Sequence, residues 1–258
     1  MEYNNELKTI DTEAKAYLLG MFLADGCITT KNANRLSLVD QQIIDDLHKH
    51  FPFFNKGSCD FSKYNESSKV QYSLTKKSKE LQDHFIEHGL VANKSTEGSE
   101  DIFVKDLSDD LTKHLLRGYF DGNGSISIPT ARPNLRRAEF CSSSKKLINQ
   151  IKDILEKFGL TVSKIKENPN TILYVIEWWK NENIVKLKDI LYKDATIYLK
   201  RKKDIFDSHV IKTALEKYLP CIHCDGGYMT KEGFRSNKQG KYCRYRCTIC
   251  KKYHQLYI

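Results

Sequence analysis

The sequence predicts an α+β protein made of two similar halves followed by a small cysteine-rich domain. Two observations carry this prediction. A nine-residue stretch, LLGMFLADG, begins at Leu18 and recurs as LRGYFDGNG from Leu116, so that Gly20 and Gly118 lie 98 residues apart. Near the C-terminus, two Cys-x2-Cys pairs lie close together. Each copy of the repeat follows helical sequence and precedes an alternating run, a pattern typical of a helix that stops at glycine and leads into a strand.

Each half is expected to follow the order α-β-β-α-β-β-α, with the repeated stretch in its first helix. In the first half we predict strands near 27–31, 35–40, 58–64 and 69–75 and helices near 41–51 and 78–89. In the second half we predict strands near 125–129, 135–142, 161–167 and 171–178 and helices near 144–159 and 183–191. These assignments rest on apolar residues that recur with the helical or the strand period.

Composition places the chain among ordinary globular proteins. Of its 258 residues, 40% are hydrophobic and 29% charged, and no apolar run has the length of a signal peptide or a membrane span. We therefore expect a cytoplasmic protein. The net charge of +9 lies at the C-terminal end, because residues 198–258 hold 14 Lys and Arg against 5 Asp and Glu, whereas residues 1–197 hold 28 of each sign. This favours a polyanionic partner, with an ordinary solvated surface as the alternative.

Small residues four apart indicate how the two repeated helices meet. Gly20 and Ala24 form one stripe with almost no side chain, and Gly118 and Gly122 form another. Two such stripes can pack backbone against backbone, which would bring Asp25 and Asn123 side by side at the helix ends. A carboxylate is disfavoured at a helix C-terminus by roughly 0.3 to 1 kcal/mol. A divalent cation there would remove the conflict.

At these residues the sequence resembles the LAGLIDADG homing endonucleases of the single-chain, two-motif type. The resemblance implies two pseudo-symmetric αββαββα subdomains with saddle-shaped antiparallel sheets, and a monomer that cuts double-stranded DNA at a specific site with Mg²⁺. It also implies origin in a mobile element of a phage, bacterium or organelle, with no membrane or small-molecule partner. By this likeness Asp25 takes the position of the first catalytic acid and metal ligand. Asn123 takes the second position, although its amide carries no charge.

The neutral Asn123 leads us to expect strand-biased cutting or nicking. Two alternatives stay open on the same scaffold: a non-catalytic DNA-binding regulator, and an RNA maturase. Lys77 and Lys180, just after the last strand of each half, correspond to basic residues that assist catalysis in the family, with Lys76 as an equally placed candidate.

Strand alternation assigns an outward sheet face that can read base edges in a major groove. The predicted DNA contacts from this face and its edges are Lys31, Arg35, Ser37, Lys69, Gln71, Ser73, Ser125, Ser127 and Arg137. A basic cluster, YLKRKKDIF, resembles the C-terminal signature of the family and contains Lys200 and Arg201. These two would contact phosphates or match the charge of a helix end.

The C-terminal cysteines predict a structural zinc ribbon. Cys221 and Cys224 form the first knuckle and Cys247 and Cys250 the second, with 22 residues between the pairs (247 − 224 − 1). The segment resembles the zinc ribbons of insertion-sequence transposases. Cys243, His223 and His254 are nearby alternatives as ligands, which we take as bystanders. The predicted DNA contacts of the ribbon are Arg235, Lys238, Lys241, Arg244 and Arg246.

The domain boundaries follow from the repeat and from the cysteine pairs. We expect subdomain 1 over residues 1–97 and subdomain 2 over 98–207, with a linker over 97–110. A second linker over 208–219 precedes the ribbon at 220–258.

Overall fold

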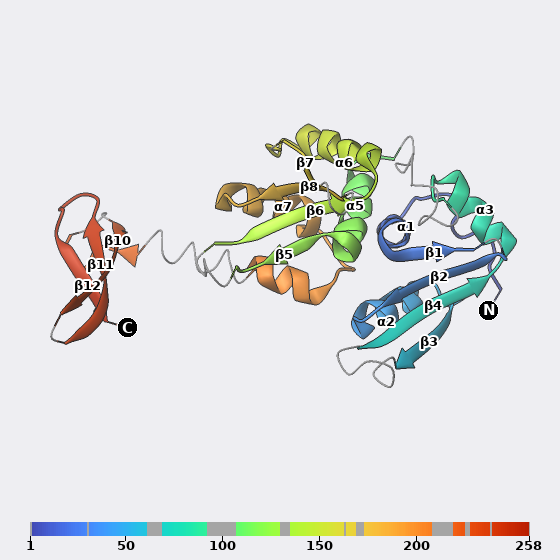
Figure 1. Cartoon of the computed structure of the whole chain (residues 1–258), viewed down its shortest axis with the longest axis horizontal. Coiled ribbons are helices and arrows are strands. Elements are labelled where there is room, and N and C mark those ends of the chain that lie inside the picture. Colours follow the sequence, from blue (N-terminus) through green and yellow to red (C-terminus); the bar gives the residue numbers. More distant parts are fainter. Residues whose placement is uncertain are drawn as a thin grey trace. The chain divides into compact units, whose positions relative to one another are not determined.

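The chain forms two compact units, Met1–Asp204 and Ile205–Ile258 (Figure 1). The computed structural model describes residues 2–29, 31–60, 69–91, 107–129, 135–162, 164–168, 173–207, 219–224, 228–237 and 239–257. The predicted boundaries at 97, 98 and 208 fall among or beside residues outside these ranges. The finer domain limits therefore stay predictions.

The first half of unit 1 contains a four-stranded antiparallel sheet in the order β1-β2-β4-β3. Helix α1 (Glu13–Asp25) is capped at its N-terminus by Thr12, whose hydroxyl accepts a hydrogen bond from the Lys15 N–H at 3.4 Å. The other elements are β1 (Gly26–Ile28), β2 (Ala33–Leu38), α2 (Gln41–His50), β3 (Asn55–Asp60), β4 (Val70–Lys77) and α3 (Lys79–Glu87).

The second half repeats this arrangement, with the sheet order β5-β6-β8-β7. Its elements are α5 (Asp109–Asn123), β5 (Ser125–Ser127), β6 (Arg137–Ser142), α6 (Lys145–Lys157), β7 (Lys166–Asn168), β8 (Leu173–Trp178) and α7 (Asn181–Tyr192). Residues 200–207 are helical. The predicted mixed fold with paired antiparallel sheets is confirmed.

Aromatic side chains join the first helix of each half to its core. In the first half, the ring of Phe22 on α1 lies 4.4 Å from that of Phe85 on α3, measured between centroids. In the second, Phe120 on α5 lies 5.0 Å from Phe140 on β6. All four side chains are buried. Each repeated helix is therefore anchored in its own half through a phenylalanine at the same place in the repeat.

Two predicted strands differ from the structure. The strand expected over 161–167 is β7 at Lys166–Asn168, because the carbonyl of Thr161 accepts a hydrogen bond from the Trp178 indole at 2.9 Å instead of joining the sheet ladder. The strand expected over 58–64 begins earlier, at Asn55, and its residues after Asp60 lie outside the described ranges.

Unit 2 is an antiparallel sheet in the order β12-β11-β10-β9. The strands are β9 (Leu219–Pro220), β10 (Tyr228–Asn237), β11 (Gly240–Cys247) and β12 (Tyr253–Tyr257). Its small core contains Met229, Cys243, Tyr245 and Cys247. In the described part of the chain, no helix combines the length and the apolar character needed to cross a membrane.

Candidate functional site

Helices α1 and α5 meet through their glycines, as the repeat predicts. A Cβ added to Gly20 would lie 2.1 Å from the carbonyl oxygen of Leu115, and one added to Gly118 would lie 2.1 Å from that of Tyr17. Real Cβ atoms never approach backbone so closely, so only glycine permits this contact. The helix ends are consequently held together by backbone packing.

Asp25, the last residue of α1, lies against the end of α5. A Cβ built on Gly122 would lie 3.3 Å from the Asp25 Oδ2 atom. Asp25 also lines a cavity of about 210 Å³ together with Ser37, Gln71, Gly122 and Arg201. The Nε atom of Arg201 donates to both carboxylate oxygens of Asp40, at 2.9 and 3.1 Å. Carboxylate, amide, hydroxyl and guanidinium groups are thus gathered around the end of α1.

A second carboxylate at this cavity belongs to Asp121, which stands at neither of the two motif positions, 25 and 123. It is 2% exposed and accepts hydrogen bonds from the hydroxyls of Tyr17 and Tyr192, at 2.8 and 2.6 Å, and from the Leu199 N–H at 2.8 Å. Burial raises the pKa of Asp121, opposed by the Tyr192 and Leu199 donors. Because both of its oxygens accept hydrogen bonds, Asp121 has a structural role. The motif, which concerns positions 25 and 123, does not indicate this role.

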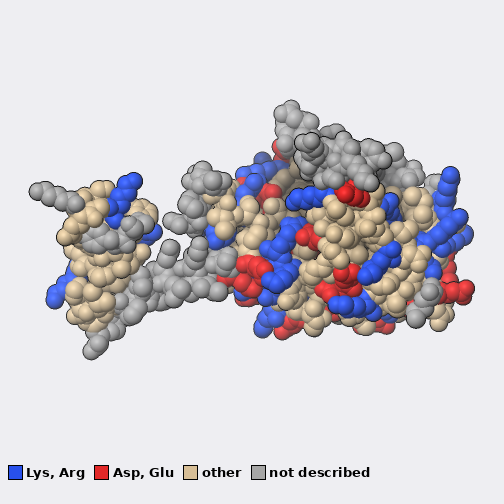
Figure 2. All heavy atoms as spheres, turned by 90° about the horizontal axis from the view of Figure 1, so that it is seen from below, with Lys and Arg blue, Asp and Glu red and all other residues tan. Residues whose placement is uncertain are grey.

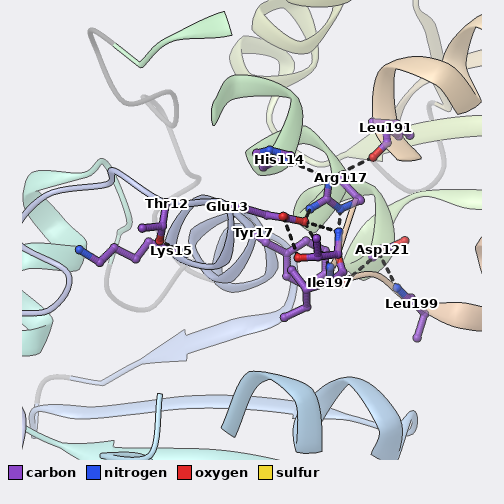
Figure 3. A network of polar contacts seen from close by, with 11 residues as sticks. Thr12, Glu13, Lys15, Tyr17, His114, Arg117, Asp121, Leu191, Ile197 and Leu199 are labelled. Carbon is purple, nitrogen blue, oxygen red and sulfur yellow. Dashed lines mark hydrogen bonds and ion pairs between the residues drawn. The ribbon is translucent and has the colours of Figure 1, made fainter. Parts of the chain in front are cut away.

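An ion pair between a buried arginine and a partly buried glutamate joins the two halves beside the helix crossing (Figure 3). Arg117 on α5 is 1% exposed and its Nη2 atom donates to the Glu13 carboxylate of α1 at 2.6 Å. The same guanidinium donates to the carbonyl oxygens of Ile197 and Leu191, at 2.9 and 3.1 Å. Glu13 also accepts from the N–H and the hydroxyl of Thr196, both at 2.8 Å. This network fixes α1, α5 and the segment before residue 200 together.

The outward face of the first sheet follows the predicted alternation. In register, Arg35 faces Thr75 and Ser37 faces Ser73, while the buried Leu36 and Leu74 face each other on the opposite side. Arg35 and Ser37 are also joined, because the arginine Nε donates to the serine Oγ at 2.8 Å. Ser73 lies on this face but is only 6% exposed. It is therefore less accessible to a DNA partner than the sequence suggests. Lys31 and Lys69 are exposed at its edges.

Two family models match the chain, one in each half. The LAGLIDADG-like domain model matches residues 110–192, and the WhiA LAGLIDADG-like domain model matches residues 14–81. Both matches contain the sheet of their half, and each extends into or across its glycine-containing helix. The chain carries two LAGLIDADG-like domains.

Solved structures with this fold include nucleases bound to DNA. The homing endonuclease I-WcaI bound to its DNA recognition sequence is 15% identical, with a TM-score of 0.52, and the match covers 77% of this chain and 87% of that chain. The meganuclease I-SmaMI bound to uncleaveable DNA is 10% identical, with a TM-score of 0.52, and the match covers 80% and 92%. At sequence identities this low, the structural similarity shows a shared fold and no more.

A curated relative is the DNA-directed RNA polymerase subunit Rpo1C of Methanocaldococcus jannaschii. It is 25% identical over 161 residues, which make up 62% of this chain and 17% of that protein. The chain therefore spans less than a fifth of this relative, and the likeness is confined to one part of it.

In the described part of the second half, charged groups on the sheet pair with one another. Ser127 is exposed and pairs with Arg137, and Ser125 pairs with Glu139. Arg137 forms ion pairs with Glu139 and Glu177, at 2.5 and 2.9 Å. Its charge is therefore shared with two carboxylates. The two sheets, although alike in topology, differ in the chemistry of this face.

The predicted catalytic lysines lie apart from the Asp25 cavity among the residues that the structure describes. Lys77 is exposed at the end of β4, opposite Ala33. Lys180 precedes α7 and lines a different cavity, with Trp179 and Lys166. Lys76 faces Asn34, whose side-chain amide donates to the Lys76 carbonyl at 3.2 Å. Arg201 is the predicted basic residue that the LAGLIDADG-like fold brings to the cavity.

Four cysteines of unit 2 form a candidate metal centre. The Sγ atoms of Cys221, Cys224, Cys247 and Cys250 all lie within 4.8 Å of one another. Cys221 and Cys250 are 3.6 Å apart at sulfur, as are Cys224 and Cys247. This is close to the spacing of about 3.8 Å between thiolates in tetrahedral zinc sites with bonds of about 2.3 Å. Cys243 belongs to the core instead, at 4% exposed.

Basic and aromatic side chains share the exposed surface of unit 2. The guanidinium groups of Arg244 and Arg246 lie 4.6 and 5.5 Å from the ring centre of Tyr253. Arg244 also pairs with Glu232 at 2.6 Å. Arg235 and Lys241 are exposed, and Lys238 lies outside the described residues. In the view of Figure 2, the charged groups visible on this unit are Lys and Arg, whereas unit 1 shows both signs.

Proposed function

We propose that this chain is a site-specific DNA endonuclease that hydrolyses phosphodiester bonds of duplex DNA with Mg²⁺ held at Asp25. The observation that carries the proposal is the place of Asp25, at the end of α1, against α5 and on the wall of a cavity that Gln71 and Arg201 also line. A helix C-terminus disfavours a carboxylate, so this place suits a bound cation. The DNA-bound nucleases that share the fold support the same activity.

Each polar group of the cavity has a part in this chemistry. When bound, Mg²⁺ would supply Lewis-acid stabilisation of the phosphate and a more acidic water. Asp25 would hold the ion. Arg201, which is 54% exposed and oriented by Asp40, would offset charge on the phosphate through its fork of donors. Lys77 and Lys180 lie outside this cavity, so they have no part in the proposed hydrolysis at Asp25.

The sheet face and the basic C-terminal unit would bind the duplex. The first sheet would contact base edges through Arg35, Ser37, Gln71 and Ser73. The second sheet would do so through Ser125, Ser127 and Arg137. The DNA phosphates would be contacted by Lys31, Lys69 and Lys200. The ribbon would add contacts through Arg235, Lys238, Lys241, Arg244 and Arg246. Zinc held by the four clustered thiols would fold this unit, because its apolar core is small.

The neutral Asn123 makes the two strands unequal in this proposal. Asp25 would serve one scissile phosphate with a charged ligand, while the second position offers an amide. We therefore expect one strand to be cut much faster than the other.

A strand-resolved cleavage assay tests the proposal. Wild-type protein and Asp25→Asn would be incubated with Mg²⁺ and a randomised duplex library, with each strand labelled separately. We expect biased cleavage by the wild-type protein and none by Asp25→Asn. Equal rates on both strands would overturn the bias. Cleavage that persists in Asp25→Asn would overturn the active site.

A second candidate is a DNA-binding regulator without nuclease activity. Two observations favour it: the match of residues 14–81 to the WhiA LAGLIDADG-like domain, and the amide at Asn123. Selection of a duplex sequence from the same library without any cleavage would support this candidate, whereas preference for structured RNA would point to a maturase.

A further inference from the structure

The ends of helices α1 and α5 carry groups of opposite charge. Helix α1 ends at Asp25 and has no basic residue in its last turn. Helix α5 ends at Asn123 and has no basic residue in its last turn either, yet a cation reaches its end from a distant part of the chain. That cation is the ammonium group of Lys202, from the helical residues 200–207.

Lys202 is built into the end of α5. Its Nζ atom donates to the carbonyl oxygens of Phe120, Asp121 and Gly124, at 2.7, 2.8 and 2.6 Å. The side chain is 3% exposed, and the neighbouring Leu199 N–H is bound to the Asp121 carboxylate. Three donors of one ammonium group are therefore satisfied by helix-end carbonyls, where the partial negative charge of α5 is concentrated.

The charge of Lys202 persists near neutral pH. Burial lowers the pKa of Lys202 to about 8, against the opposing effect of the nearby Asp121 carboxylate. The ammonium form therefore predominates at pH 7.

The remaining oxygens at this end do not form a metal site. The amide nitrogen of Asn123 donates back along α5 to the Tyr119 hydroxyl at 3.3 Å, and the Asn123 carbonyl accepts from the Cys141 thiol at 3.0 Å. The Asp121 carboxylate accepts from Tyr17, Tyr192 and Leu199. A divalent cation needs several oxygens free of such donors. With these oxygens engaged, this end of α5 offers a second ion little more than the Asn123 amide oxygen, and one neutral oxygen does not make a divalent site.

We propose that the Lys202 ammonium takes the place of a second divalent cation at the end of α5, so that unit 1 binds one such ion, at Asp25. This inference rests on the proposed Mg²⁺ site at Asp25. It also gives a reason for Asn123: a second carboxylate is not needed where the chain supplies its own positive charge. Lys202 is a positioning residue here, because it acts on the helix end and not on the substrate.

Counting bound ions tests this inference without a DNA target. Full-length protein, first loaded with one equivalent of Zn²⁺, would be titrated with Mn²⁺, and free Mn²⁺ would be measured by its paramagnetic resonance signal. We expect one bound Mn²⁺ for the wild type and none for Asp25→Asn. Asn123→Ala should still bind one, because Asn123 is not a ligand.

Two further variants isolate the part of Lys202. Asn123→Asp should still bind one Mn²⁺, because the ammonium occupies the helix-end carbonyls. Combining Asn123→Asp with Lys202→Met should raise the count to two. Circular dichroism would establish that each variant is folded. The number of Mn²⁺ ions bound to Asn123→Asp tests the role of Lys202 even if the double variant fails to fold.

The outcomes separate this inference from the function on which it rests. Two ions bound to the wild type, or to Asn123→Asp alone, would overturn the replacement by Lys202 and leave the nuclease proposal intact. No ion bound to the wild type would overturn the Asp25 metal site and this inference with it.

Discussion

Glu13 illustrates how a single partly buried carboxylate can make stability depend on pH. Burial by itself would raise its pKa, but the donors from Thr196 and the Arg117 guanidinium outweigh burial and hold the pKa of Glu13 below its usual value of 4.5. A carboxyl group whose pKa is lowered by folding stabilises the fold above its unfolded pKa, and this contribution is lost as pH falls through the folded value.

Replacing Glu13 by glutamine should therefore destabilise the protein mainly above about pH 4.5. Because Arg117 would stay buried without its partner charge, we expect Glu13→Gln to lower the free energy of unfolding by about 3 kcal/mol at pH 7. Urea unfolding from pH 3 to 8 measures this. The difference from wild type should shrink as pH falls below about 4.5.

Asp83→Asn provides the matched control for this measurement. Asp83 pairs with Lys79 on the exposed side of α3, and its side chain is 49% exposed. Its replacement should change the free energy of unfolding by less than about 1 kcal/mol. A loss from Glu13→Gln no larger than that of the control would contradict the structural importance of the network.

At the same scale, the sequence predicts some site residues and misses others. The spacing predicts the cluster of four cysteines, which the structure has, and the motif predicts Asp25, which the structure places at a cavity. The roles of Asp121 and Lys202 were not predicted, since their partners lie about 70 to 80 residues away: Tyr192 and Leu199 bind Asp121, and Lys202 binds carbonyls of α5. Nothing local distinguishes Lys202 from Lys200, which is exposed and pairs with Asp204. Only the fold separates the buried lysine from the surface one.

At the scale of elements, the crossing of α1 and α5 depends on the absence of side chains. An alanine in a helix is ordinarily more favourable than glycine by roughly 0.5 to 1 kcal/mol. At Gly118 the added methyl group would lie 2.1 Å from the carbonyl oxygen of Tyr17, so the helices would have to separate. A loss of stability in Gly118→Ala can thus be assigned to packing and not to helix propensity.

We expect Gly118→Ala to lower the free energy of unfolding by about 3 kcal/mol, measured by urea denaturation. Gly57→Ala is the control, because a Cβ there would meet only the Ser73 hydroxyl, at 3.2 Å. The control should lose no more than about 1 kcal/mol. Equal effects of the two substitutions would show that the close approach of the helices is not required.

The elements themselves were largely predictable, because the repeat fixes their order and the alternation fixes their faces. The prediction failed where side chains interrupt the sheet ladder. The strand expected over 161–167 is found at Lys166–Asn168, and the indole of Trp178 holds the Thr161 carbonyl outside the sheet ladder. A contact between residues 17 positions apart in the sequence does not affect the local periodicity of apolar residues, so the sequence pattern could not predict it.

At the scale of the whole molecule, the two units should respond differently to metal removal. Desolvation and the neighbouring thiols raise the pKa of Cys224 to about 12, whereas at Cys247 desolvation is outweighed by the N–H groups of Ile249 and Cys250, which lower the pKa of that thiol to about 6. Within the cluster, Cys224 is thus a thiol that keeps its proton at pH 7 until a metal binds. Zinc uptake should therefore release protons at neutral pH, and removal of the ion should unfold unit 2. Unit 1 has its own core and should keep its structure.

Chelation of zinc tests this expectation. Limited proteolysis with mass spectrometry should show cleavage within residues 219–257 after chelation, while fragments of Met1–Asp204 stay protected. Cys250→Ser should give the same pattern without a chelator. Protection of unit 2 in both cases would contradict a structural ion at the four thiols.

The Glu13–Arg117 pair also bears on how freely the two domains could be exchanged. With the repeat offset of 98 residues, Arg117 corresponds to Leu19 and Glu13 to Leu111, so the pair has no symmetric counterpart across the pseudo-twofold axis. Two copies of the first domain would bring two acids without an arginine, and two copies of the second would bury two arginines without the glutamate that pairs with them. Chimeras built by grafting one half onto itself should assemble poorly, whereas the natural order of the halves supplies each charge once.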